Sequence, residues 1–136
     1  MLDGGARWDR PAHLTDAGYD LTAITEGTLQ PGERLLVPTG IHLHMPPTMV
    51  AYVMPRSGLA AKQGVTVLNS PGVIDAGYTG QIRVCLINHG DKLFDFEYGD
   101  RIAQLVFHKI EHPDIEFVEA LPRTKRSDNG FGSTGR

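Results

Sequence analysis

Hydrophobic residues recur in short runs that alternate with polar ones, and glycine and proline separate the runs. In residues 81–88, Ile82, Val84 and Leu86 point to one face, whereas Arg83, Cys85 and Ile87 point to the other, which is the period of a strand. Similar runs predict strands at residues 37–44, 50–54, 81–88, 93–98, 102–110 and 115–119. Short strands about ten residues apart, separated by turns, predict an all-β sandwich, jelly roll or barrel.

Three segments depart from this pattern. Residues 57–64 (SGLAAKQG) predict a helix of about two turns, with Ser57 as the N-cap and Gly64 at the C-terminal end. The Asn-Ser-Pro-Gly sequence at 69–72 predicts a turn between two short strands, and therefore a β-hairpin. Residues 122–136 are basic and rich in Gly and Ser, so we expect a flexible arm that follows a barrel domain of residues 1–121.

Composition narrows the class of protein. The 136 residues fit one domain, and 40% hydrophobic with 21% charged residues is typical of a globular chain. A net charge of −3 provides no broad basic surface, so we expect no nucleic-acid partner. The single cysteine, Cys85, excludes an internal disulfide and fits a reducing compartment. No run approaches the ~20 apolar residues of a membrane span, so we expect a soluble cytoplasmic protein.

Two segments have residues suited to anion binding. Arg56, Ser57 and Gly58 lie where a predicted strand meets the predicted helix, and backbone amides, a hydroxyl and a guanidinium together can bind a phosphate. The alternative is that Ser57 only caps the helix and Arg56 is a surface charge. The sequence GFGSTG at 130–135 can form a concave nest of backbone amides, or it is a solubilising end of the chain.

Several polar residues are candidates for catalysis or metal binding. Asp75 and Tyr78 lie among glycines that would let a ligand approach the backbone, and Asp75 there could act as a general base. Asp16 and Asp20 could each hold a divalent cation directly or through water. Gln104 stands among apolar neighbours and needs a hydrogen-bond partner, either the protein backbone or a ligand.

The histidines and the cysteine are weaker candidates. His42 and His44 share one strand face, but no Cys or carboxylate follows at zinc-finger spacing. His108 and His112 also lack such partners, so we assign no metal to either pair. Cys85 lies in an apolar strand, where buried packing is favoured over a role as nucleophile.

Five motifs in this order resemble the trimeric dUTP pyrophosphatase (dUTPase) family. They are AGYDL at 17–21, PRSGLA at 55–60, GVIDAGYTG at 72–80, GDRIAQ at 99–104, and Arg126 followed by GFGSTG at 130–135. They span nearly the whole chain. The last motif departs from the family pattern, because Ser127 and Asn129 stand where the family usually has glycine.

The resemblance implies a fold and an assembly. Members of the family are similar to a distorted jelly roll, or β-clip barrel, with one short helix. The resemblance implies a homotrimer with three active sites at subunit boundaries, each built from motifs of neighbouring chains. It also implies that residues 122–136 of one subunit close the site of another.

The resemblance further implies that the chain is a dUTP diphosphatase, which hydrolyses dUTP to dUMP and pyrophosphate by in-line attack of water on the α-phosphorus. Asp75 would be the general base, and Mg²⁺ would be held by Asp20 through water. The expected phosphate-binding residues are Arg56, Ser57, Gly58, Gln104, Arg126, Gly132, Ser133 and Thr134, of which Arg56 and Gln104 also have catalytic roles. The expected nucleoside-binding residues are Asn69, Gly72, Val73 and Ile74 at the uracil edge, Tyr78 under the deoxyribose, and Phe131 stacked on the base.

Two other functions are considered. A dCTP deaminase-like member of the same fold would need a Glu-based site, but the segment after Gly80 reads QIRVC, without Glu. A non-catalytic regulator that binds dUTP would show binding without turnover, and the retained Asp75 argues against it.

Overall fold

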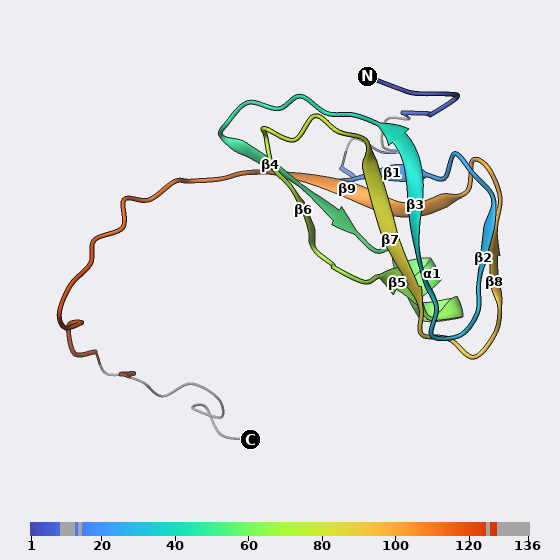
Figure 1. Cartoon of the computed structure of the whole chain (residues 1–136). Helices are drawn as coiled ribbons and strands as arrows, with labels where there is room; N and C mark the ends of the chain where they lie inside the picture. The colour runs from blue at the N-terminus through green and yellow to red at the C-terminus, as the bar shows by residue number, and fades with distance from the viewer. Residues whose placement is uncertain (9–12, 14, 125, 128–136) are drawn as a thin grey trace.

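The computed structural model describes residues 1–8, 13, 15–124, 126 and 127. Within these residues it has nine strands and one short helix (Figure 1). The elements are β1 (Gly18–Thr22), β2 (Gly27–Leu29), β3 (Arg34–Ile41), β4 (Met49–Met54), α1 (Ser57–Gln63), β5 (Val65–Val67), β6 (Gly72–Ile74), β7 (Ile82–Asn88), β8 (Phe94–Phe96) and β9 (Arg101–Lys109). The prediction of an all-β fold with one short helix is confirmed.

Three antiparallel sheets enclose the core. One sheet has the strand order β1-β9-β4-β6, the second has β3-β7-β5, and β2 pairs with β8. Strands distant in sequence are therefore neighbours, because β9 lies between β1 and β4. Inward-facing side chains fill the space between the sheets, and Leu21, Val37, Leu86 and Leu105 are fully buried. In β7 the buried positions alternate as the sequence predicts.

Two local predictions are wrong. The strands on either side of the 69–72 turn do not pair, because β5 pairs with β7 and β6 pairs with β4. Each strand thereby joins a different sheet, where Val65 and Val67 are buried and Gly72 packs against Val53. Residues 115–119 form no strand. Their apolar side chains lie exposed in this chain, with Phe117 95% exposed, because no neighbouring strand of the described chain pairs with them.

The segment after β9 leaves the barrel. Residues 111–124 extend away from the sheets in Figure 1, and their side chains are exposed. Most of the predicted arm, residues 128–136, lies outside the described residues. Among the residues that the structure describes, no helix is long and apolar enough to cross a membrane.

Candidate functional site

A cluster of charged and polar side chains forms where β4 ends and α1 begins. Arg56 is half-buried, its Nε lies 3.3 Å from Oδ1 of Asp20, and its Nη1 donates to the carbonyl of Arg101 at 2.9 Å. Nη1 of Arg101 lies 3.3 Å from the second oxygen of Asp20. We call Asp20, Arg56, Arg101 and Gln104 the Arg56 cluster. Its two guanidinium groups share one carboxylate, so it retains positive charge that can attract an anion.

Gln104 joins this cluster across the sheet. It stands opposite Asp20 in the β1–β9 register, and its Nε2 donates to the carbonyl of Pro55 at 2.9 Å. The sequence left two possible partners for Gln104, the protein backbone or a ligand, and the structure confirms the backbone. A Cβ added to Gly18 would overlap the Gln104 carboxamide, so glycine at position 18 lets this side chain lie flat across β1.

Asp20, Arg56 and Gln104 of the Arg56 cluster line an open cavity of about 510 Å³. The lining residues are Asp16, Ala17, Gly18, Asp20, Arg56, Ser57, Gly58, Gln104 and Val106. Ser57 does not cap α1, which corrects the sequence prediction: the N-cap is Arg56, without a side-chain hydrogen bond. Ser57 instead begins the helix with an exposed side chain. Because the first N–H groups of a helix lack helical acceptors, this end of the cavity has donors for a ligand. Gly64 ends the helix as predicted, with a φ of 69°.

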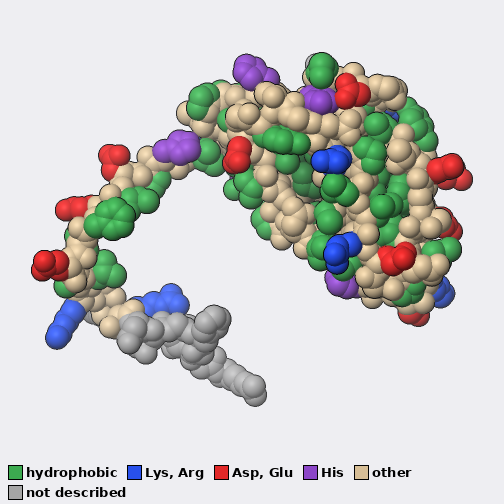
Figure 2. Space-filling model, viewed as in Figure 1, with side chains coloured by type: hydrophobic (Ala, Val, Ile, Leu, Met, Phe, Trp, Pro, Cys, Tyr) green, Lys and Arg blue, Asp and Glu red, His purple; other side chains and the backbone are tan. Residues whose placement is uncertain are grey.

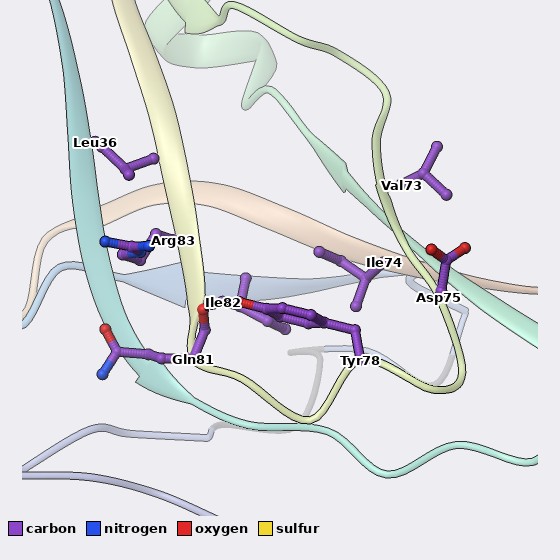
Figure 3. A pocket seen from close by; sticks show the side chains of 8 residues that line it. All are labelled: Leu36, Val73, Ile74, Asp75, Tyr78, Gln81, Ile82 and Arg83. Carbon is purple, nitrogen blue, oxygen red and sulfur yellow. Dashed lines mark hydrogen bonds between the residues drawn. The ribbon is translucent and has the colours of Figure 1, made fainter.

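A second cavity lies beside the loop of residues 75–81, which we call the Asp75 loop (Figure 3). Its volume is about 260 Å³, and its lining residues are Leu36, Val73, Ile74, Asp75, Tyr78, Gln81, Ile82 and Arg83. In Figure 3, Ile74 points toward Tyr78 and Ile82, whereas Val73 and Asp75 lie on the other side of the ribbon. Val73 is 57% exposed and Asp75 is exposed. The segment therefore presents an apolar edge and a carboxylate to the outside of the chain.

Hydrogen bonds within the Asp75 loop hold Tyr78 in place. Its backbone N–H donates to the carbonyl of Asp75 at 3.0 Å, and its hydroxyl donates to the carbonyl of Gln81 at 2.9 Å. The ring lies across Gly80, where an added Cβ would come within 2.6 Å of the Tyr78 hydroxyl. At the other end of β6, the amide nitrogen of Asn69 lies 3.3 Å from the position of a Cβ on Gly72. Asn69, Gly72, Val73, Ile74, Asp75 and Tyr78 thus lie along one segment of the chain.

The two cavities are far apart within one chain. Ile74 pairs with Ala51 in the β4–β6 register, so Asp75 lies beside the start of β4, whereas Arg56 follows its far end. Six residues of extended chain separate the two positions along the strand, which corresponds to about 20 Å. One chain therefore brings Arg56, Ser57, Gly58, Gln104 and Asp20 together, and separately Asp75 with Tyr78, but it does not bring these two groups into one pocket.

The remaining predicted site residues are in the C-terminal segment. Arg126 is exposed and lines neither cavity. Phe131, Gly132, Ser133 and Thr134 lie outside the described residues.

Two interactions were missed from the sequence. Arg101 was not singled out, although its position in the GDRIAQ motif, beside the end of β1, could have indicated it. Asp3 and His42 form an ion pair with 2.6 Å between Oδ2 and Nε2. Hydrogen bonds, first to the carbonyl of Thr79 and then to Asp3, raise the pKa of His42, and the His42 hydrogen bond lowers the pKa of Asp3.

The potential for metal binding is limited to a few oxygens. Asp16 and Asp20 line the same cavity, and carboxylates suit Mg²⁺, which usually takes one or two of them together with water and phosphate oxygens. In the described part of the chain, no group of three or more His, Cys, Asp or Glu could hold a metal ion. These residues therefore fit a Mg²⁺ that is held largely by its water and by a ligand. Cys85 is only half-buried and lies opposite Leu36 in the β3–β7 register.

Comparison with known proteins identifies relatives over the full chain. The dUTPase family model matches residues 8–135. The deoxyuridine 5'-triphosphate nucleotidohydrolase of Clostridium tetani (strain Massachusetts / E88) is 47% identical, and the match covers 100% of this chain and 94% of that protein. That of Corynebacterium glutamicum is 52% identical, over 99% of this chain and 91% of the relative.

Solved structures share the fold. The Staphylococcus bacteriophage 80alpha dUTPase with dUPNHPP has a TM-score of 0.90 and 29% identity, over 100% of this chain and 96% of that one. A mutant dUTPase from phage phi11 of S. aureus, described with a structural Mg(II) ion, has a TM-score of 0.80 and 26% identity, over 88% and 94% of the two chains. Because the family model and the relatives match almost from end to end, and solved dUTPases have the same fold, the chain belongs to the dUTPase family.

Proposed function

We propose that this chain hydrolyses dUTP to dUMP and pyrophosphate, through attack of water on the α-phosphorus. The family and the names of its relatives support the substrate. The observation that carries the proposal is the presence of two complementary half-sites on one chain. The Arg56 cluster has cationic groups and amide donors for phosphates, and the segment from Asn69 to Tyr78 has backbone groups, an aromatic ring and a carboxylate for a nucleoside and a nucleophile.

The separation of these half-sites supports a homotrimer with shared sites. A carboxylate that activates water at the α-phosphorus and a guanidinium that binds the phosphates must lie within a few ångströms of the same group. Asp75 and Arg56 are about 20 Å apart along β4, so a second copy must supply one of them. Leu36, Val73 and Tyr78 are 47%, 57% and 43% exposed, and Figure 2 shows hydrophobic side chains over β3 and β7, as expected of a surface that packs against another subunit.

In this trimer each of three boundary sites takes Asp75 from one subunit and the Arg56 cluster from its neighbour. Residues 122–136 act as an arm that closes a site, so that Phe131 stacks on uracil, while Arg126, Gly132, Ser133 and Thr134 bind phosphates. The exposed apolar side chains of Ile115 and Phe117 fit a segment that leads toward another subunit. The lone cysteine and the mixed composition favour a cytoplasmic enzyme.

Each residue of the site has a defined task in the reaction. Asp75 accepts a proton from water as the new oxygen–phosphorus bond forms and the bond from the α-phosphorus to the bridging oxygen breaks. Arg56, Ser57 and Gln104 bind the phosphate oxygens, where charge increases in the transition state. Asp20 would hold Mg²⁺ through coordinated water, with Asp16 on the same cavity wall, and the chemistry of the ion would be to neutralise triphosphate charge.

Selectivity follows from the nucleoside segment. Backbone groups at Val73 and Ile74, with the Asn69 amide, pair with the uracil edge. Cytosine presents the opposite donors and acceptors and leaves buried groups unpaired, which can reduce kcat/KM by about 10⁴-fold. The backbone excludes the methyl group of thymine, and the Tyr78 ring, held by its hydrogen bond to Gln81, leaves no space for a 2′-hydroxyl.

Pyrophosphate release from dUTP, dTTP, dCTP and UTP, each with and without Mg²⁺, tests this function. The proposal predicts rapid release from dUTP with Mg²⁺ and at least ~10²-fold slower release from the other nucleotides. Ammonia release from dCTP without pyrophosphate would contradict it and indicate a deaminase. Tight dUTP binding without turnover would indicate a non-catalytic regulator.

A further inference from the structure

The N-terminal residues bind to the end of β3, close to the Asp75 loop. The N–H of Asp3 donates to the carbonyl of Gly40 at 2.8 Å, and Leu2 forms an isolated bridge with Ile41. Gly40 has a φ of 67°, and a Cβ there would lie 2.8 Å from the carbonyl oxygen of Asp3. Only glycine allows the two backbones to approach this closely, so the fold places the Asp3 side chain beside His42.

His42 connects this segment to the Asp75 loop. Its Nδ1 lies 2.9 Å from the carbonyl oxygen of Thr79, and its Nε2 lies 2.6 Å from Oδ2 of Asp3. The same Asp3 oxygen accepts a hydrogen bond from Nε2 of Gln81 at 3.3 Å. The carbonyl of Gln81 in turn accepts the Tyr78 hydroxyl. The loop is therefore held at Thr79 by His42 and at Gln81 by Asp3.

The partners of His42 determine its protonation state. A carbonyl oxygen only accepts hydrogen bonds, and an ionised carboxylate also only accepts. Both ring nitrogens of His42 face such acceptors, so both contacts are hydrogen bonds only when the ring is an imidazolium. The charged groups that face it are the Asp3 carboxylate and the Met1 ammonium, which donates to the His42 carbonyl at 3.2 Å. Hydrogen bonds to Thr79 and Asp3 raise the pKa of His42, whereas burial and the Met1 ammonium oppose this shift.

We propose that doubly protonated His42, paired with Asp3, is a positioning residue that holds the Asp75 loop in its active arrangement. The role in the reaction rests on the proposed function, because Asp75 and Tyr78 have their tasks only there. When the ring loses a proton it keeps a single donor. The proton that remains stays on Nε2, because the charged Asp3 carboxylate is a stronger acceptor than a carbonyl. The Nδ1 lone pair then faces the Thr79 carbonyl, so the 2.9 Å contact becomes repulsive and the loop loses its attachment at Thr79.

Three variants distinguish the effect of the His42 charge from the effect of losing its hydrogen bonds. Asp3→Asn can donate its amide N–H to a neutral His42, which still donates from Nδ1 to Thr79, so the attachment no longer depends on pH. His42→Phe removes both hydrogen bonds. His44→Gln is the matched control, because His44 is two residues along the same chain segment, is exposed and has no hydrogen bond among the described residues.

Hydrogen exchange tests the attachment without substrate. The Tyr78 N–H, which bonds to the Asp75 carbonyl, is followed by mass spectrometry in a peptide covering residues 75–81. At equal pH, His42→Phe should exchange about two- to tenfold faster than wild type, the effect of one lost hydrogen bond, and His44→Gln should not differ. Nitrogen-15 NMR at pH 6 should show both His42 nitrogens protonated. Neutral-ring signals, or unchanged exchange in His42→Phe, would overturn the proposal.

Kinetics test the consequence for the reaction. For the wild type and His44→Gln, kcat/KM for dUTP should fall about two- to tenfold as pH rises through the titration of His42, whereas Asp3→Asn should lack this fall. Identical profiles for wild type and Asp3→Asn would overturn the role of His42. If no variant released pyrophosphate from dUTP, the proposed function would fail instead, and the exchange data would still decide whether His42 holds the loop.

Discussion

Two inactive variants should restore each other's activity if each site takes Asp75 from one subunit and Arg56 from another. The proposed sharing rests on β4, which separates the two residues by about 20 Å within a chain. Asp75→Asn removes the base, and Arg56→Ala removes a phosphate ligand. Each should reduce turnover of dUTP by at least ~10²-fold when it is the only chain present.

The recovery can be calculated from random assembly. A site in a mixed trimer is intact only if the subunit that supplies Asp75 is the Arg56→Ala chain and its neighbour is the Asp75→Asn chain. With equal amounts of both, this combination occurs at about one quarter of the sites. Pyrophosphate release by the co-expressed variants should therefore reach about a quarter of the wild-type rate.

A control pair of variants places both substitutions in the phosphate-binding half-site. Arg56 and Gln104 line the same cavity, so a mixture of Arg56→Ala and Gln104→Ala chains should show no recovery. Differently tagged chains confirm that mixed trimers form. If tagged mixed trimers of Asp75→Asn and Arg56→Ala had no more activity than either variant alone, the shared-site reasoning would be refuted.

Three further predictions follow from particular contacts. Gly18→Ala should push the Gln104 carboxamide away from the carbonyl of Pro55. The variant should have a kcat/KM for dUTP reduced by about 10- to 100-fold, with little change in the midpoint of urea denaturation. An unchanged kcat/KM would show that this placement of Gln104 is unimportant for the reaction. Asn88→Ala should lower the free energy of unfolding by about 2–4 kcal/mol, measured by urea denaturation, because the buried Asn88 side chain bonds to Leu29, Lys92 and Gly90. The raised pKa of His42 and the lowered pKa of Asp3 mean that their pair stabilises the fold fully between about pH 4 and pH 6.5. The contribution of His42 is lost as pH rises through its raised pKa, and that of Asp3 is lost as pH falls through its lowered pKa. The difference in free energy of unfolding between wild type and Asp3→Asn should therefore be largest in this interval. A difference independent of pH would contradict the ion pair between Asp3 and His42.

Strand periodicity predicted most of the fold, because one-sided burial leaves a clear pattern. In β7 fully buried positions alternate with less buried ones as its sequence indicates, and β4, β8 and β9 lie within a few residues of the predicted strands. β1 and β2 were missed because they are short and contain polar residues. The failed hairpin shows the limit of local signals, since the 69–72 turn does occur but its flanking strands find better partners in separate sheets.

The motifs named the candidate site residues, and the family resemblance implied sites shared by neighbouring chains, but neither indicated which residues one chain brings into one cavity. The motifs named Arg56, Ser57 and Gln104, which the fold brings to one cavity, and Asp75 with Tyr78, which it brings to another. Their separation depends on the direction of β6 relative to β4, which no motif encodes. The Asp3–His42 pair was not foreseen either, because its partners are 39 residues apart in sequence and meet only where Gly40 allows the N-terminal segment to approach.

The central claim is that water attacks the α-phosphorus of dUTP, and it is tested most directly by finding which phosphorus atom receives the water oxygen. Hydrolysis of dUTP in ¹⁸O-labelled water, followed by ³¹P NMR or mass spectrometry of both products, shows which phosphorus receives the water oxygen. Attack at the α-phosphorus with Asp75 as base predicts one ¹⁸O atom in dUMP and none in pyrophosphate. Label in pyrophosphate would contradict the account, because water would then have attacked the β-phosphorus.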